Sequence, residues 1–425
     1  MKQITALLLG AGQRGAEVYA RYALQFPNEL KIVGVAEPRE ERRKALAELH
    51  GIPSDNCFAD WREGLDRERF ADCVFVCTQD REHDQPAILA LEKGYDVLCE
   101  KPMSNEPGKI LNMGNAAART GRILSVCHVL RYAPFFVKLK ELLDAGAVGR
   151  IAAVQHIEEV GYWHMAHSFV RGNWADSSQS SPMILQKCCH DLDILSWLIE
   201  SPCRSVSSYG GLLHFRPENR PADAPEHCMD GCPHRDECPY YAPRFYLEHP
   251  RAISDGFTGV VSADPSREAL LAALSNGPYG RCVYTCGNNV VDHQIVNLQY
   301  ENGVTASLVM SAFTQRCDRV IYIMGSTGQI RGGMEDGILV HTDFASGQTS
   351  EVRLNVSHTG HGGGDQRLMK DFLAVVRGEK PLSRSSADAS VESHLIALAA
   401  EESRLCGGKA LDPKRWANTK IRPSR

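Results

Sequence analysis

Three side chains in this sequence are of types that can move a proton or stabilise a developing alkoxide. Lys101 follows directly after the apolar run 95–99, which predicts a buried strand. Lys187 and His190 lie three residues apart in the segment 185–199, whose periodicity predicts one helix, and both are within reach of one small molecule. A lysine that exchanges protons near neutral pH needs a pKa lowered by burial or by another cation. The sequence therefore predicts acid–base chemistry on a polar substrate by Lys101, Lys187 or His190.

A glycine pattern near the N-terminus predicts the cofactor for that chemistry. It follows the apolar run 4–9, typical of a parallel strand buried on both faces, and it reads G-x-G-x-x-G. The first glycine permits a tight turn, the second admits a pyrophosphate, and the third allows close packing of the helix expected over 16–26. The cofactor contacts expected in this turn are Gly10, Gly12, Gln13, Arg14 and Gly15.

Glu37 stands at the end of a second apolar run, 32–36, about 20 residues after the turn. A carboxylate there accepts hydrogen bonds from both hydroxyls of the adenosine ribose and repels a 2′-phosphate, which favours NAD over NADP. Arg39, Arg42 and Arg43 lie close by and keep NADP open, because an arginine can pair with that phosphate.

Strand and helix patterns continue to alternate up to residue 127, which predicts a doubly wound parallel sheet. Ligands of such sheets bind beyond the carboxyl ends of the strands. The further cofactor contacts expected at that edge are Thr78, Gln79, His83, Glu100, Lys101 and His128. For His83, a helix-capping or surface position is the alternative.

The glycine turn, Glu37 and the segment Cys-Glu-Lys-Pro-Met-Ser at 99–104 together resemble the Gfo/Idh/MocA family, named for glucose-fructose oxidoreductase and inositol dehydrogenase. The resemblance implies an α/β protein with a Rossmann domain, expected at 1–130, followed by an α/β domain with an open, mostly antiparallel sheet at 131–425. It also implies NAD(P)-linked redox at a sugar or cyclitol carbon, with Lys101 near the nicotinamide and the substrate hydroxyl.

The sequence departs from the family pattern at one position. That pattern implies an Asp and a His one helical turn apart; His190 supplies the His, but Gln186 stands where the Asp would be. Glutamine cannot take a proton. Either His190 works as base without that carboxylate, or Lys187 takes over part of the task.

The stretch 161–174, expected to be irregular, is dense in aromatic, His and Arg residues, a mixture suited to sugar binding. Arg171 is alternatively a partner for a carboxylate or sulfonate on the substrate. The alternative for this stretch is a loop held in place by its own aromatic residues. For the glycine-rich stretch around His361, the alternative is a connector in which Asp365 caps the N-terminus of the next helix. The substrate contacts expected are Tyr162, His164, His167, Arg171, Trp174 and His361.

Strand patterns recur in the second half, with Glu301-Asn302-Gly303 as a hairpin signal. The runs are 151–160, 206–215, 294–300, 304–310 and 320–324, and they predict a substantially antiparallel sheet. Such a sheet can leave one face for a subunit partner, so a homo-oligomer, dimer or tetramer, is expected.

A Cys-rich insertion near 227–240 has close cysteines among turn residues, which predicts a structural zinc site. The ligands expected are Cys228, Cys232 and Cys238 with Cys282 as the fourth, and His227 or His234 as alternatives to Cys282. An iron–sulfur cluster or a plain Cys-rich loop stays open.

Composition restricts the partners. The 425 residues carry a net charge of −5 with no basic run, which argues against nucleic acid, and no stretch approaches the roughly 20 apolar residues of a membrane span. We therefore expect a cytoplasmic NAD-dependent oxidoreductase acting on a sugar, cyclitol or glycoside. The alternatives are an NAD-dependent glycosidase that works through transient oxidation, and a non-catalytic sugar or NAD sensor.

Overall fold

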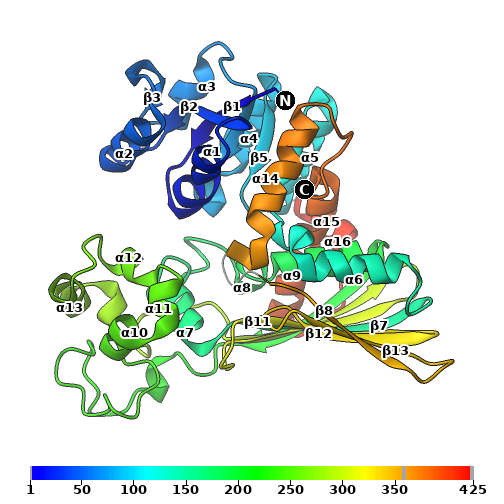
Figure 1. Ribbon diagram of the computed structural model, residues 1–425. Coiled ribbons are helices and arrows are strands. Elements are labelled where there is room, and N and C mark those ends of the chain that lie inside the picture. Colours follow the sequence, from blue (N-terminus) through cyan, green and yellow to red (C-terminus); the bar gives the residue numbers. More distant parts are fainter. Residues whose placement is uncertain (1, 357–359, 422–425) are drawn as a thin grey trace.

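The chain folds around two β-sheets, each covered by helices (Figure 1). The computed structural model describes residues 2–356 and 360–421. No helix within these ranges is long and apolar enough to cross a membrane.

The first sheet has six parallel strands in the order β3-β2-β1-β4-β5-β6. They are β1 (Ile4–Leu9), β2 (Leu30–Ala36), β3 (Cys57–Phe58), β4 (Cys73–Val76), β5 (Asp96–Cys99) and β6 (Leu124–Val126). β4 and β5 are buried at every position, because helices cover both faces of the sheet, and this burial explains their continuous apolar sequences. The predicted doubly wound sheet is confirmed.

Successive residues of β1 belong to different cores on the two faces of this sheet. Leu7 belongs to the core that includes α4 (Asp84–Glu92) and α5 (Pro107–Thr120). Leu8 belongs to the core that includes α1 (Arg21–Gln25), α2 (Glu40–His50) and α14 (Gly360–Val376). The helices of this domain are η1 (Gln13–Ala20), α1 (Arg21–Gln25), α2 (Glu40–His50), η2 (Ser54–Asn56), α3 (Trp61–Asp66), η3 (Asp80–Glu82), α4 (Asp84–Glu92) and α5 (Pro107–Thr120). Helix α14 (Gly360–Val376) comes from the far end of the chain, and its Phe372 ring lies 6.0 Å from that of Phe75 (Figure 1).

The second sheet has eight strands in the order β14-β13-β12-β11-β7-β10-β9-β8. They are β7 (Ile151–Glu159), β8 (Cys203–Gly211), β9 (His293–Tyr300), β10 (Thr305–Ser311), β11 (Asp318–Gly325), β12 (Gly328–Gly333), β13 (Ile338–Asp343) and β14 (Thr349–Arg353). Every pair is antiparallel except β7 with β10. The predicted open, mostly antiparallel sheet is confirmed, including the hairpin at Gly303, whose φ of +88° suits glycine.

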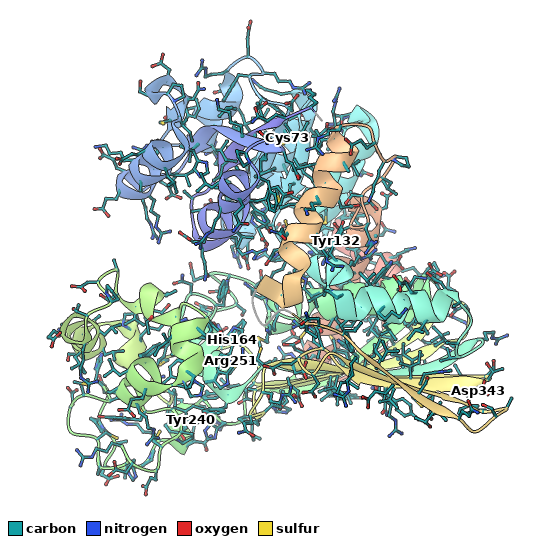
Figure 2. All side chains as sticks on the ribbon, in the orientation of Figure 1. Cys73, Tyr132, His164, Tyr240, Arg251 and Asp343 are labelled. Atoms are coloured by element: carbon teal, nitrogen blue, oxygen red, sulfur yellow. The ribbon has the colours of Figure 1, made fainter. Side chains whose placement is uncertain are left out.

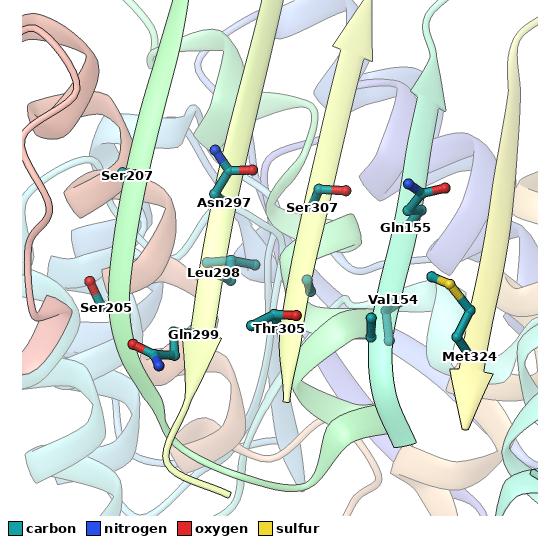
Figure 3. A pocket seen from close by; sticks show the side chains of 12 residues that line it. Val154, Gln155, Ser205, Ser207, Asn297, Leu298, Gln299, Thr305, Ser307 and Met324 are labelled. Carbon is teal, nitrogen blue, oxygen red and sulfur yellow. The ribbon is translucent and has the colours of Figure 1, made fainter. Parts of the chain in front are cut away.

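Helices cover one face of the second sheet (Figure 1). They include η4 (Val129–Tyr132), α6 (Pro134–Asp144), α9 (Cys189–Ile199), α15 (Ala387–Leu405) and α16 (Pro413–Ile421). Strand β9 alternates strictly between exposed and buried residues, because its other face is turned to solvent. The exposed face carries Gln155, Asn297, Gln299, Thr305 and Ser307, which Figure 3 labels.

A helical insertion connects β8 to β9 and lies beside the sheet (Figure 1). Its elements are η6 (Pro217–Asn219), α10 (Ala242–Glu248), α11 (Pro250–Ser254), α12 (Phe257–Val261), α13 (Arg267–Asn276) and η7 (Pro278–Gly280). A separate small core holds it together, in which Phe245, Tyr246 and Leu274 pack with Trp163.

Two segments near the expected site differ from the sequence pattern. The single helix expected over 185–199 is broken at Lys187 and Cys188 into α8 (Met183–Gln186) and α9. The stretch 161–174, expected as irregular, is mainly helical as α7 (Tyr162–His164) and η5 (Met165–Arg171), because its aromatic residues are buried against the insertion.

Candidate active site

The glycine turn is built for the close approach of a ligand at one position. Gly10 has φ +95°, and a Cβ on Gly10 or Gly15 would overlap a backbone carbonyl group. A Cβ on Gly12 would meet nothing closer than the Arg42 Nη1 atom at 4.0 Å. The first and third glycines are thus required by the fold, and Gly12 leaves the space that a pyrophosphate would need in front of η1.

Glu37 is buried beside this turn. Its Oε2 atom accepts a hydrogen bond from the Ala11 N–H at 2.8 Å, and its Oε1 atom accepts one from the Arg39 N–H at 3.0 Å. The carboxylate therefore lies at the carboxyl end of β2, facing the glycine turn. From this position the carboxylate can accept hydrogen bonds from the ribose hydroxyls.

The His83 ring joins two loops at the carboxyl edge of the sheet. Its nitrogens lie 2.7 Å from the Pro102 carbonyl oxygen and 3.0 Å from that of Thr78. His83 is buried in these contacts, so its position fits a brace between the loops that follow β4 and β5. Thr78 and Gln79 lie in the first of these loops.

Arg14 of the glycine turn ties the first domain to α14. Its Nε atom lies 2.6 Å from Glu100, and its Nη2 atom lies 2.6 Å from Asp365. Burial alone would raise the pKa values of both carboxyl groups, but Arg14, together with Lys101 at Glu100 and with His361 at Asp365, outweighs burial and lowers them. Arg14 is thus a fixed ion-pair partner beside Lys101.

Lys101 reaches across to the second domain. Its Nζ atom donates to the backbone oxygen of Gln186 at 2.9 Å and to the Gln186 Oε1 atom at 3.2 Å. The glutamine that departs from the family pattern therefore contacts the lysine through its amide oxygen. A carboxylate in its place would give the ammonium a full charge partner, whereas the amide leaves the charge of Lys101 available to a substrate oxygen.

His190 lies deep in the same place without a protein partner. Neither of its ring nitrogens has a hydrogen-bond partner among the described residues, and its ring centre lies 5.7 Å from that of His128 and 5.6 Å from that of His361. Burial, and then the charge of Lys101, hold the pKa of His190 well below its usual range. His190 is therefore a neutral imidazole near pH 7, able to accept a hydrogen bond or a proton.

Lys187 belongs to a buried ion-pair cluster. Its Nζ atom lies 3.1 Å from Glu158, whose other oxygen lies 3.0 Å from Arg319, and Arg319 also contacts Asp191 at 3.1 Å. Burial alone would lower the pKa of Lys187, but Cys317 and Glu158 outweigh it and the pKa is raised. A raised pKa disfavours proton transfer by Lys187 near neutral pH. Of the three residues considered for acid–base chemistry, Lys101 and His190 therefore stay as candidates.

Two contacts hold the halves of the site together. Arg131, after β6, forms a bidentate pair with Asp193 of α9 at 2.6 and 2.8 Å. His394 of α15 accepts a hydrogen bond from the Met103 N–H at 2.9 Å, two residues after Lys101. The first contact fixes the helix that carries His190 against the segment after β6, and the second fixes α15 against the loop that carries Lys101.

Of the aromatic stretch, His164 lies nearest the Lys187 cluster. Its Nδ1 atom is 3.6 Å from the Cys317 Sγ atom, and Figure 2 places it where the insertion meets the sheet. Tyr162 and Trp174 are half-buried, and their rings lie 6.0 Å from Tyr240 and 5.9 Å from Phe169. The expected substrate contacts are therefore spread along the edge of the insertion.

His167 and Arg171 are occupied inside the insertion. His167 contacts the Tyr246 hydroxyl at 2.8 Å and stacks on Phe257 at 4.1 Å. Arg171 donates to the carbonyl oxygens of Arg281 at 2.8 Å and Tyr240 at 2.7 Å. Both side chains are buried, so they fit a structural role in the insertion better than the predicted substrate contacts.

The expected zinc site is not supported. No group of three or more His, Cys, Asp or Glu side chains within residues 2–356 and 360–421 could hold a metal ion. His234 instead contacts Glu237 and Asp223 at 2.7 Å each, and the Arg171 Nη2 atom lies 3.8 Å from Cys228. The physical reason for the difference is that a buried guanidinium, not a metal, links the Cys-rich segments. The cysteines expected as ligands, Cys228, Cys232, Cys238 and Cys282, are free thiols.

Sequence reasoning missed the charged groups that surround the candidates. They are Glu158, Asp191, Arg319 and, as an ion-pair partner of Arg14, Asp365. The neutral Tyr19 hydroxyl, which accepts a hydrogen bond from Arg14, was missed as well. Glu158 gave one usable signal, because it follows Val154 and His156 on one face of β7, and a charged residue on a buried face needs a partner.

Two family models match the chain. The model described as the oxidoreductase family, NAD-binding Rossmann fold, matches residues 4–128, and the model of its C-terminal alpha/beta domain matches residues 140–405. A nicotinamide cofactor suits the open space at Gly12 and the position of Glu37.

The relatives with the names given below are an oxidoreductase and two dehydrogenases. The Bacillus subtilis protein YteT, named as an oxidoreductase, is 25% identical and covers 95% of both chains. An inositol 2-dehydrogenase of Streptomyces avermitilis is 29% identical over 52% of this chain and 59% of its own length. The D-glucoside 3-dehydrogenase of Escherichia coli K12 is 32% identical over 34% of this chain and 40% of its own length.

Solved structures share the fold. An oxidoreductase from Agrobacterium radiobacter in complex with NAD+, L-tartaric acid and magnesium has a TM-score of 0.69 at 14% identity, covering 97% of this chain and 99% of its own. The aldose-aldose oxidoreductase of Caulobacter crescentus has a TM-score of 0.66 at 14% identity, covering 96% and 99%. At such identities the likeness concerns the fold.

Proposed function

Because this chain belongs to the Gfo/Idh/MocA family of oxidoreductases, we propose that it is an NAD-dependent dehydrogenase acting at a secondary carbinol of a sugar, cyclitol or glycoside. The observation that carries the proposal is that Lys101 reaches from the first domain to Gln186, at the end of the helix that precedes the one bearing His190. Lys101 contacts Gln186 at 2.9 and 3.2 Å, and the unpartnered ring of His190 lies on the next helix. A hydroxyl group is the kind of ligand that both side chains can bind at once.

The two side chains divide the work on that hydroxyl. Bound NAD supplies the acceptor for a hydride from the carbinol carbon. The Lys101 ammonium stabilises negative charge on the substrate oxygen, which makes the hydroxyl more acidic. A ring nitrogen of His190, kept neutral by its lowered pKa, then accepts the proton.

We propose NAD as the physiological cofactor rather than NADP. Glu37 supports this choice, because its carboxylate lies beside the glycine turn and would repel a 2′-phosphate. Arg42 supports the alternative, since its guanidinium lies near Gly12. Comparing kcat/KM for NAD and NADP, in the wild type and in Glu37→Ala, tests the choice; a wild type that prefers NADP would contradict it.

A glycosidase that uses bound NAD transiently is the second candidate, favoured by the presence of a further imidazole. His361 lies 5.6 Å from His190, keeps 34% of its side chain exposed and contacts Asp365 at 3.3 Å, so the site has two acid–base groups of different exposure. Elimination and water addition need such a pair. Release of a chromogenic aglycone without accumulation of NADH would favour this candidate over the dehydrogenase.

We propose that the exposed face of the second sheet binds another copy of this chain. A shallow depression of about 430 Å³ lies across β7 to β11, and uncharged residues line it (Figure 3). The labelled polar side chains are Gln155, Ser205, Ser207, Asn297, Gln299, Thr305 and Ser307. Sedimentation that gives only monomer at micromolar concentration would contradict this assembly.

The central experiment replaces Lys101 by alanine. We expect kcat to fall by about 10²–10⁴-fold on an identified substrate, the range of acid–base and electrostatic contributions. NAD affinity should stay within a few-fold, because Lys101 donates to Gln186 and not to the glycine turn. Lys44→Ala, a change at an exposed lysine of the same domain, is the control. Unchanged turnover in Lys101→Ala would refute the proposed mechanism.

A further inference from the structure

Arg14 of the glycine turn is the meeting point of three segments that lie far apart in the sequence. Its Nε atom donates to Glu100, 86 positions later, and its Nη2 atom donates to Asp365, 351 positions later, both at 2.6 Å. Glu100 directly follows β5, and Asp365 lies near the start of α14. One guanidinium group therefore joins the glycine turn to the loop that carries Lys101 and to a helix from the far end of the chain.

A buried hydroxyl group closes this set of contacts. The Tyr19 hydroxyl accepts a hydrogen bond from the Arg14 Nη2 atom at 2.6 Å and donates one to the Glu100 Oε1 atom at 2.5 Å. Tyr19 and Glu100 are buried, whereas the Arg14 side chain keeps 29% of its surface exposed. Water cannot readily replace Arg14 as the donor to these two groups, so a change at Arg14 must disturb both of them.

The contacts of Arg14 extend to the backbone of Lys101. The second oxygen of Glu100 accepts a hydrogen bond from the Lys101 N–H at 2.9 Å. Among the residues that the structure describes, the Lys101 ammonium contacts only the two oxygens of Gln186, at 2.9 and 3.2 Å. Glu100 therefore sets the backbone position of Lys101, while the lysine side chain carries an unpaired charge across to the second domain.

The same guanidinium group fixes the start of α14. His361, Gly362 and Gly363 have left-handed backbones, with φ of +51°, +66° and +86°, so α14 is kinked just before Asp365. A left-handed conformation costs energy at a residue other than glycine and persists where surrounding contacts hold it. The pair of Arg14 with Asp365, which also contacts His361 at 3.3 Å, is such a contact.

We propose that Arg14 is a positioning residue, which holds Lys101 and the start of α14 in the geometry that the reaction requires. The inference rests on the proposed function. Arg14 acts through Glu100 and Asp365, because its planar fork offers each carboxylate a donor in a fixed direction. The loop after β5 and the kinked segment therefore cannot shift independently of the glycine turn.

Arg14→Lys tests this role on the NAD-loaded protein with an identified substrate, because lysine keeps the charge but loses the fork that spans two carboxylates. We expect kcat to fall about 10²-fold, the effect of a misplacement of about 1 Å at a reacting group. The KM for the substrate should stay within a few-fold, since the contact of Lys101 with Gln186 does not involve Arg14. Arg404→Lys, at an arginine that pairs with Glu401 of its own helix, is the matched control. An Arg14→Lys protein with the kcat of the wild type would overturn the proposal.

Free guanidinium ion distinguishes positioning from a loss of folding. In Arg14→Ala, the added ion can bind between Glu100 and Asp365, so we expect kcat to rise with its concentration, whereas urea at the same concentrations should give no rise. Both reagents weaken folding, so a defect caused by unfolding would become worse in each. A folded Arg14→Ala protein whose kcat only falls with guanidinium would show a structural role alone and would overturn the proposal. If Arg14→Ala does not fold, Arg14→Lys decides.

Amide hydrogen exchange tests the same coupling without any substrate, in the cofactor-free and the NAD-loaded protein. In Arg14→Lys, residues 100–104 and 361–368 should exchange about 10- to 150-fold faster, the effect of losing one hydrogen bond to a charged group, while β9 should be unaffected. If the wild type turns over no sugar, cyclitol or glycoside but this faster exchange is seen, the proposed function fails and the positioning by Arg14 stands. If the wild type is active and both segments exchange as before, the function stands and the inference is wrong.

Discussion

Replacing Gly12 by alanine separates the fold of the glycine turn from its binding role. Gly12 has an extended backbone, φ −76° and ψ −172°, which alanine adopts without strain. A Cβ there would meet no protein atom closer than 4.0 Å. The free energy of unfolding should therefore change by less than about 0.5 kcal/mol, or rise by up to about 1 kcal/mol because the unfolded chain loses freedom.

The same methyl group fills the space that a pyrophosphate would need. Forcing a methyl into a closely packed contact costs about 1–3 kcal/mol, so the Kd for NAD should rise by about 5- to 150-fold. Titration of NAD by calorimetry measures Kd, and urea unfolding without cofactor measures stability on the same protein sample.

Gly15→Ala is the matched control, because its Cβ would overlap the Gly10 carbonyl group. This variant should lose stability as well as affinity. A Gly12→Ala protein with unchanged NAD affinity would refute the position of the pyrophosphate, and one as unstable as Gly15→Ala would refute the geometry of the turn.

Three further outcomes are expected. Burial, and then the charge of Arg171, lower the pKa of His167 from 6.5 to about 3, so its unfolded form binds more protons below pH 6.5 and stability falls as the pH drops. His167→Phe keeps the stacking on Phe257 and should reduce the loss of unfolding free energy between pH 7 and pH 5 by about 2 kcal/mol in urea titrations; an unchanged loss would contradict the buried neutral ring. Arg171→Leu should lower stability by about 1–3 kcal/mol, because two buried carbonyl oxygens lose their donor, whereas a chelator should leave the Tm of the wild type unchanged; a Tm lowered by the chelator would restore the metal hypothesis. Phe372→Ala should cost about 3–5 kcal/mol and weaken NAD binding, since its ring packs on β4; an effect confined to the second domain would argue against that packing.

Local patterns predicted the first domain well. β4 and β5 are continuous apolar runs because both faces are buried, and the glycine spacing reflects steric limits that Gly10 and Gly15 show directly. The break between α8 and α9 could not be predicted, because the ion pair of Lys187 with Glu158 joins residues far apart in the chain.

The predicted substrate contacts show the other limit of sequence reasoning. His167 and Arg171 have the residue types that bind sugars, but the same types also build polar cores. Which of these two roles applies depends on Tyr246 and Tyr240, which lie 79 and 69 positions later in the chain. No local pattern contains that information.

Helix α14 has a consequence for the synthesis of the chain. The core on one face of the first sheet includes Leu368, Met369 and Phe372, which leave the ribosome long after β6. At about 5–20 residues per second, the delay is on the order of ten to fifty seconds. During that interval the nascent chain presents the apolar face of Leu8 and Phe75, so we expect chaperones that bind nascent chains to be retained until α14 emerges.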